Sequence, residues 1–92
     1  MSEARGTLTV VNQRGLHARA SAKFVTAVAE LPSSVSVRVA KGGVEAAGGS
    51  ILGLMMLGAA KGDTIEVIVS GEGREAVLAQ LSAMVEDGFG ES

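Results

Sequence analysis

Cysteine is absent from this sequence of 92 residues, and the only aromatic side chains are those of Phe24 and Phe89. Without cysteine the chain forms no disulfide, thiolate zinc site or iron–sulfur cluster. Two phenylalanines cannot build a base-stacking surface, and a net charge of −2 does not provide the basic face that phosphate-backbone binding needs. These shortages argue against a nucleic-acid-binding protein.

Long apolar runs are also missing. The longest, residues 51–60, spans ten residues and includes two glycines, whereas a membrane-spanning helix needs about 20 apolar residues. The first five residues are not followed by the apolar segment of a secretory signal. We therefore expect no membrane insertion and a cytoplasmic location.

Apolar residues make up 47% of the chain, which is enough for it to fold. At this length we expect a single domain over residues 1–92 that acts as a monomer. The charge is unevenly distributed: residues 1–44 hold six basic and two acidic residues, and residues 45–92 hold two basic and eight acidic ones. The basic first half is expected to attract an anion or an acidic partner.

The hydrophobic pattern alternates between a period of two and a period near 3.6 residues. It predicts strands at 7–11, 34–39, 44–47 and 64–69, and helices at 18–31, 51–57 and 74–85. Strands with one apolar face need helices on that face only. We thus predict an α+β fold of order β-α-β-β-α-β-α, a two-layer open-faced sandwich whose four-stranded antiparallel sheet is covered on one face by three helices. Residues 86–92 are expected to form a frayed tail.

The only histidine, His17, lies between the first strand and the first helix, at or next to the helix N-cap. A lone histidine is commonly just an exposed loop residue. Here, however, Arg14 and Arg19 flank it and Lys23 follows one turn later, at a helix start whose free N–H groups favour an anion. Positive neighbours disfavour the imidazolium, and the neutral imidazole is a nucleophile. A phosphoryl group on His17 would be stabilised by the same surroundings.

Other chemistry has less support. His17 has no second histidine or cysteine with which to share a metal, and no Ser/Asp triad can be identified. The glycine pairs at 42–43 and 48–49 lack nucleotide-loop spacing. An activated nucleophile without a substrate pocket predicts a carrier of a group between larger proteins, with no metal and no cofactor, rather than an enzyme.

Two segments resemble a known family: Gly-Leu-His-Ala-Arg at 15–19 and Gly-Ser-Ile-Leu-Gly-Leu-Met-Met-Leu-Gly at 49–58. Together they are similar to HPr, the histidine phosphocarrier of the bacterial phosphotransferase system, over about residues 8–84. The resemblance implies that enzyme I, charged by phosphoenolpyruvate, phosphorylates His17 on Nδ1, and that EIIA-type proteins receive the group. Arg19 matches the family's phosphate-stabilising arginine. Ala20 departs from the usual proline, which puts some stability in doubt but not the chemistry.

Ser50 follows a Gly-Gly pair before an apolar helix, the usual arrangement of an N-cap. The resemblance adds a second role, because in many bacteria this position is the target of HPr kinase/phosphorylase. In the helix that follows, Leu54 and Leu57 share the expected buried side. Ile51, Leu52 and Met55 match the partner-contact positions of HPr, although in a protein this small the helix could instead be buried on several sides.

Two alternatives stay open. The β-α-β-β-α-β order is also that of ferredoxin-like and ACT-type domains, which would make the chain a regulatory or ligand-binding module. Within the carrier interpretation, either sugar transport or the nitrogen-related regulatory branch is possible. Ala20 and the Met55-Met56 pair favour the proteobacterial regulatory type.

Overall fold

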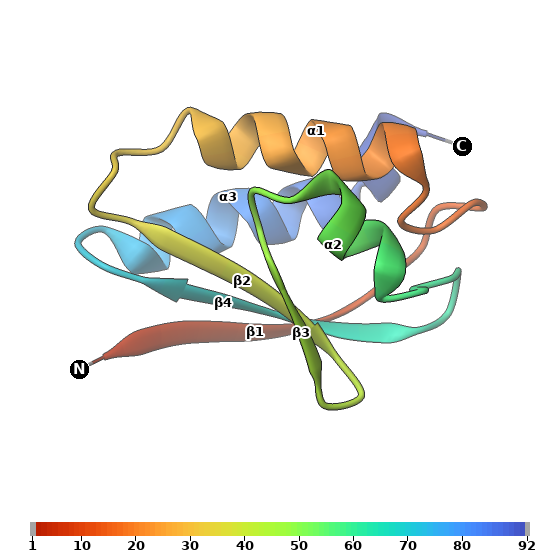
Figure 1. Ribbon diagram of the computed structural model, residues 1–92, viewed down its shortest axis with the longest axis horizontal. Helices are drawn as coiled ribbons and strands as arrows, with labels where there is room; N and C mark the ends of the chain where they lie inside the picture. The colour runs from red at the N-terminus through yellow and green to blue at the C-terminus, as the bar shows by residue number, and fades with distance from the viewer. Residues whose placement is uncertain (1, 92) are drawn as a thin grey trace.

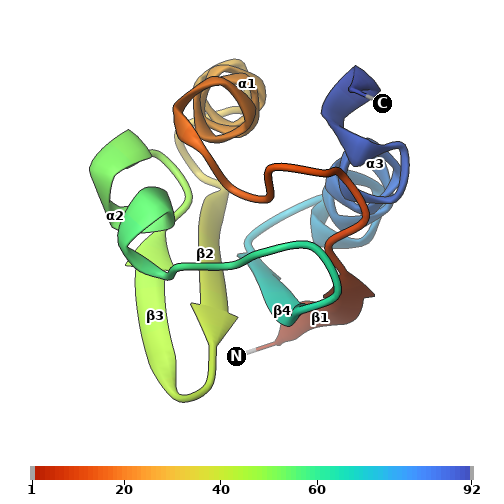
Figure 2. The same ribbon diagram turned by 90° about the vertical axis from the view of Figure 1, so that its right-hand side faces the viewer.

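The computed structural model describes residues 2–91 and has a sheet on one side and helices on the other (Figure 1). Its elements are β1 (Glu3–Thr9), α1 (Ala18–Ala29), β2 (Ser36–Lys41), β3 (Val44–Ala47), α2 (Ile51–Met56), β4 (Thr64–Ser70), α3 (Arg74–Glu86) and the short 3-10 helix η1 (Gly88–Gly90). The sheet has the order β1-β4-β2-β3, and every neighbouring pair is antiparallel. Figure 2 shows α1, α2 and α3 over the same face of the sheet. The predicted open-faced α+β sandwich is confirmed.

Two strands begin at other residues than predicted, and β4 ends one residue later than predicted. β1 begins at Glu3, because its polar N-terminal half pairs with β4 from Glu3 opposite Ser70 onward. β2 begins at Ser36, since the amide of Val35 donates to the carbonyl of Pro32 in a turn. In both cases hydrogen bonding rather than side-chain alternation sets the boundary.

The core lies between the helices and the covered face of the sheet. Its fully buried side chains come from the predicted apolar stripes, including Phe24 of α1, Leu54 of α2 and Leu81 of α3. From β4 the predicted inward residues Ile65, Val67 and Val69 are at most 2% exposed. Within residues 2–91, no helix is long and apolar enough to cross a membrane.

The open face of the sheet is less polar than its sequence suggested, because Ile68 on that face is also buried. Arg5 on β1 and Arg38 on β2 lie opposite Ile68 in the strand register. Their guanidinium groups form a network that spans the sheet and covers Ile68. Arg5 binds Glu3 and Glu66 at 2.9 and 3.1 Å, and Arg38 binds Glu45 at 2.8 Å and also contacts Glu3. Hydrogen bonding to Arg5 first, and the charge of Arg38 next, hold the pKa of Glu3 below its usual value.

The expectation of a frayed tail is wrong for the described residues after α3. The chain reverses in η1, where Phe89 adopts a left-handed conformation with φ of 58° between two glycines. This uncommon backbone conformation is offset by burial, since the Phe89 side chain packs into the core and is 3% exposed. The Nζ of Lys23 on α1 donates to the carbonyl of Phe89 at 2.7 Å. The tail is thus fixed against the N-terminal half of α1.

The loop between β1 and α1 is held against the loop between α2 and β4. Gly15 turns the chain with φ of 64°, and the amide of Leu16 then donates to the carbonyl of Ala59 at 2.9 Å. A Cβ at Gly15 would lie 2.2 Å from that carbonyl oxygen. Only glycine permits both the turn and this close approach, which together set where α1 begins.

We predict that Gly15→Ala lowers the free energy of unfolding more than Gly42→Ala does. Gly42 also has a positive φ, of 57°, but a Cβ there meets nothing within 4 Å. The backbone term, about 1–2 kcal/mol, is therefore common to both variants. Gly15→Ala adds the clash and the loss of the Leu16–Ala59 hydrogen bond, worth about 1 kcal/mol more. Urea unfolding of both variants measures the difference, and equal losses would contradict this account of the loop.

Candidate functional site

His17 is the N-cap of α1, as the sequence predicted. Its backbone is extended, and its carbonyl accepts the amide of Ser21 at 2.9 Å, the first hydrogen bond of the helix. Its side chain caps as well, because Nδ1 accepts the amide of Arg19 at 3.2 Å. The imidazole is therefore fixed at the positive end of the helix dipole. It is not the freely exposed loop side chain of the alternative interpretation, since only 17% of it is accessible.

The other ring nitrogen of His17 contacts an acid that the sequence did not single out. Nε2 lies 2.8 and 3.0 Å from the two carboxylate oxygens of Glu91. The surroundings of the ring thus include an acid as well as the cations that the sequence indicated. The hydrogen bond with His17 is the main cause that lowers the pKa of Glu91, and a hydrogen bond from Asn12 and the charges of His17 and Lys23 act in the same direction. Glu91 is thus held in its ionised form.

Asn12 is the second residue that the sequence analysis missed at this site. Its side chain is 2% exposed, and Nδ2 donates to the carbonyl of Gly15 at 2.8 Å and to Glu91 at 3.1 Å. It connects the loop before α1 to the tail after α3. A turn-forming Asn carries a local signal, but Glu91 does not, because 74 residues separate it from His17.

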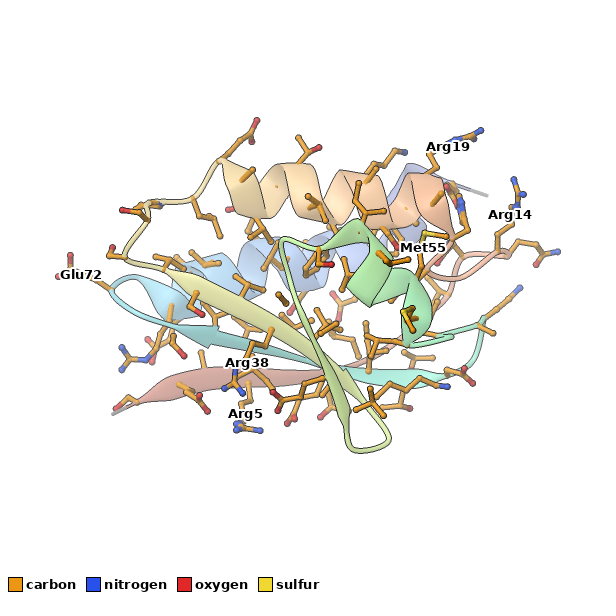
Figure 3. The ribbon with its side chains drawn as sticks, in the orientation of Figure 1. Arg5, Arg14, Arg19, Arg38, Met55 and Glu72 are labelled. Atoms are coloured by element: carbon orange, nitrogen blue, oxygen red, sulfur yellow. The ribbon has the colours of Figure 1, made fainter. Side chains whose placement is uncertain are left out.

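Three cationic side chains line one hollow together with Glu91, the acid that contacts His17. An open hollow of about 470 Å³ is lined by Gln13, Arg14, Arg19, Lys23, Gly90 and Glu91. Figure 3 shows Arg14 and Arg19 projecting at the same end of the molecule, whereas Glu72 lies at the opposite end. Within residues 2–91 the guanidinium of Arg19 has no hydrogen-bond or ion-pair partner, so it is available to an anion. The hollow has the charge and the open shape to admit a phosphoryl group.

Ala20 occupies the third position of α1 and is completely buried. The helix begins at Ala18 without a proline in its first turn, because His17 provides the cap. Unlike proline, Ala20 retains its backbone N–H in the first turn, where helical amides have no intrahelical acceptor.

Ser50 is the N-cap of α2, which the sequence also predicted. Its Oγ accepts the amide of Gly53 at 2.9 Å, and its carbonyl accepts the amide of Leu54. The hydroxyl can still donate its hydrogen. Such a cap contributes about 1 kcal/mol.

The side of α2 away from the core is exposed and apolar. Leu54 and Leu57 are buried as predicted, whereas Ile51, Leu52, Met55 and Met56 are 40–77% exposed. We call these four exposed residues the α2 patch. Met55 lies at the same end of the molecule as Arg14 and Arg19 (Figure 3). The alternative that α2 is buried on several sides is therefore wrong.

The described residues contain no group of three or more His, Asp or Glu side chains that could hold a metal ion. The arrangement combines one nucleophilic ring, an ionised carboxylate that contacts the ring, and a hollow that this carboxylate lines together with three cationic side chains.

The whole described fold and this site have close relatives among known proteins. Residues 4–87 match the family model described as the PTS HPr component phosphorylation site. A phosphocarrier protein HPr of Neisseria meningitidis is 39% identical over 92% of this chain and 93% of its own length. A phosphocarrier protein NPr of Shewanella violacea is 32% identical over 100% and 99% of the two chains. The crystal structure of HPr-C-His from Thermoanaerobacter tengcongensis superposes with a TM-score of 0.86 at 32% identity, covering 100% of this chain and 99% of that one.

The match spans both segments that carried the resemblance, and it leaves no support for a ferredoxin-like or ACT-type ligand-binding module. Relatives named HPr and NPr match at overlapping identities, so assignment to the nitrogen-related type stays a prediction. Phe89 and Glu91 lie beyond residues 4–87 that match the family model, although the alignment with the Shewanella violacea relative covers the whole chain. The chain belongs to the HPr family of phosphocarrier proteins of the phosphotransferase system.

Proposed function

We propose that this protein accepts a phosphoryl group on Nδ1 of His17 from phosphoenolpyruvate-charged enzyme I and passes it to EIIA-type proteins. It acts as a single-domain monomer in the cytoplasm, as a carrier and not as a catalyst. Membership of the HPr family supports a phosphocarrier role, and the observation that carries the finer proposal is the position of Nδ1. That nitrogen accepts the amide of Arg19, the second residue of α1, whose side chain lines the cationic hollow.

The chemistry proposed for His17 needs little rearrangement. When Nδ1 bonds to phosphorus, the amide of Arg19 can donate to a phosphoryl oxygen instead of to the ring. The helix dipole and the guanidinium of Arg19 then stabilise the new negative charge. Arg19 thus acts in two ways, through its backbone amide and through its side chain.

The α2 patch is the proposed docking surface for partners. Ile51, Leu52 and Met55 are its contact residues, and methionine side chains adapt to differently shaped partners. Arg14 and Arg19 lie at the same end of the molecule as Met55, so an acidic partner surface would be steered toward His17. Ser50 at the start of α2 is the proposed regulatory site for HPr kinase/phosphorylase.

Replacing His17 should abolish phosphorylation by enzyme I and phosphoenolpyruvate. His17→Ala removes both the nucleophile and the cap, whereas His17→Asn keeps a side chain that caps helices well. Both variants should take no acid-labile phosphate, measured by intact mass and acid treatment, and His17→Asn should retain the wild-type thermal midpoint. An acid-labile phosphate on either variant would place the phosphoryl group elsewhere.

Arg19→Ala should slow phosphoryl transfer through the carrier by roughly tenfold to a hundredfold, because a charge-assisted contact to the phosphoryl group is lost. Arg19→Lys should recover part of the rate, since a point charge lacks the guanidinium fork. Arg14→Ala, which removes the same charge from the same hollow but lies outside α1, should cost less. Time courses of phosphoryl transfer from enzyme I measure all three rates. A wild-type rate for Arg19→Ala would remove Arg19 from the proposed site.

Ser50→Asp should weaken binding of enzyme I and slow phosphorylation of His17 without lowering the thermal midpoint. Aspartate caps a helix as well as serine does, so the fold loses nothing. The added charge lies within one turn of Leu52, where it must be desolvated when a partner closes over the α2 patch. Raised salt should restore only the part of the loss due to repulsion.

Ser33→Asp is the matched control, because it adds the same charge at an exposed position in the loop between α1 and β2. It should bind enzyme I normally in a titration followed by calorimetry. If Ser50→Asp binds and reacts as fast as Ser33→Asp, Ser50 is only a helix cap.

A further inference from the structure

We infer that Glu91 is a positioning residue for phosphoryl transfer, which holds the ring of His17 with its lone pair on Nδ1 and stabilises the charge that the ring gains. This inference rests on the proposed function of His17. It adds a residue from the tail, outside the part of the chain that matches the family model.

The hydrogen bonds around the imidazole determine where its proton lies. The backbone N–H of Arg19 can only donate, so the Nδ1 atom that it contacts must carry a lone pair. The ionised carboxylate of Glu91 can only accept, so the Nε2 atom 2.8 Å away must carry the proton. The two contacts act on opposite nitrogens and select the same tautomer. Only that tautomer leaves a nucleophilic lone pair on Nδ1, the nitrogen that contacts the amide of Arg19.

The same carboxylate faces the positive charge that develops during transfer. The lone pair of Nδ1 forms the new bond to phosphorus, while the bond between phosphorus and its donor atom breaks and its electron pair leaves with the donor. The proton on Nε2 stays on the ring, so the ring becomes positively charged as the phosphoryl group arrives. Glu91 then has the same role towards His17 as the aspartate has towards the histidine of a Ser-His-Asp triad. It orients the ring and stabilises the positive charge on it.

The tail is built to hold this carboxylate in place. Phe89 is anchored in the core, and its carbonyl accepts a hydrogen bond from Lys23. Asn12 donates to the same oxygen of Glu91 that contacts His17 at 3.0 Å. The side chain of Glu91 is only 16% exposed, unlike that of an ordinary surface acid. Burial of Phe89 therefore fixes an acid whose position the local sequence does not determine.

The test compares three variants of the full chain with the wild type. Glu91→Ala removes both the acceptor and the charge. Glu91→Gln keeps an oxygen that can accept from Nε2 but removes the charge. Glu72→Gln is the matched control, because it removes the same charge from an exposed side chain at the opposite end of the molecule (Figure 3).

Two measurements need no partner protein. Nitrogen-15 NMR of the ring reports which nitrogen carries the proton. Incubation with phosphoramidate, which transfers its phosphoryl group and releases ammonia, gives the rate of phosphorylation of His17. Thermal melting checks that each variant is folded.

We expect the wild type and Glu72→Gln to show separate signals for a protonated Nε2 and an unprotonated Nδ1, and to react at equal rates. Glu91→Ala should bring the two ring signals toward each other, as the tautomers mix, and slow phosphorylation by about tenfold. Glu91→Gln should keep the tautomer and react at an intermediate rate. All variants should remain folded, so that the change in rate does not reflect a damaged structure.

Wild-type ring signals in Glu91→Ala would overturn the tautomer part of the inference, and equal phosphoramidate rates in all four proteins would overturn the charge part. Failure of enzyme I and phosphoenolpyruvate to label the wild type would instead count against the proposed function. The ring signals would still decide the position of the proton, because they are recorded without any phosphoryl donor.

Discussion

The close contact between two loops, in which Leu16 donates its amide to Ala59, is the constraint on which the site depends. Gly15 makes this approach possible, and α1 begins two residues after Leu16. His17 is therefore presented at a helix end whose position is fixed by the loop that leads from α2 to β4. The candidate phosphorylation site and the α2 patch share this one junction, so neither can move far without the other.

In the folded protein, the charged residues are not distributed as the two halves of the sequence suggested. The basic first half does not form one surface. Arg5 and Arg38 lie on the open face of the sheet and are paired with Glu3, Glu45 and Glu66, where they cover Ile68. Arg14, Arg19 and Lys23 line one hollow with Glu91, which contacts His17. The attraction for an anion is thus confined to one end of the molecule.

Much of the architecture could be predicted because it follows local rules. The alternation of Ile65, Val67 and Val69 identifies a strand with one buried face, and Ser50 after two glycines identifies a helix cap. His17 was recognised because its neighbours in sequence are also its neighbours at the helix end. The two motifs that contain His17 and Ser50 were sufficient to indicate the family.

What could not be predicted depends on contacts between distant segments. Ile68 occupies a position that alternation assigns to solvent, and it is buried only because arginines from two other strands flank it. The residues after α3 show no periodicity, so burial of Phe89 in the core could not be predicted from them. The contact between Glu91 and His17 depends in turn on Phe89, and it became visible only once the fold was complete.

The size of the α2 patch would limit the lifetime of any complex formed through it. Four exposed apolar side chains on a helix of six residues offer a small contact area, of the kind found in weak, transient complexes. With association at about 10⁷ M⁻¹ s⁻¹, a micromolar complex dissociates at about 10 s⁻¹. Each encounter would then last about a tenth of a second. If partners dock on this patch, as proposed, its small size would let the carrier leave one protein quickly before it meets the next, and enlarging the patch to bind more tightly would lengthen residence and slow the relay.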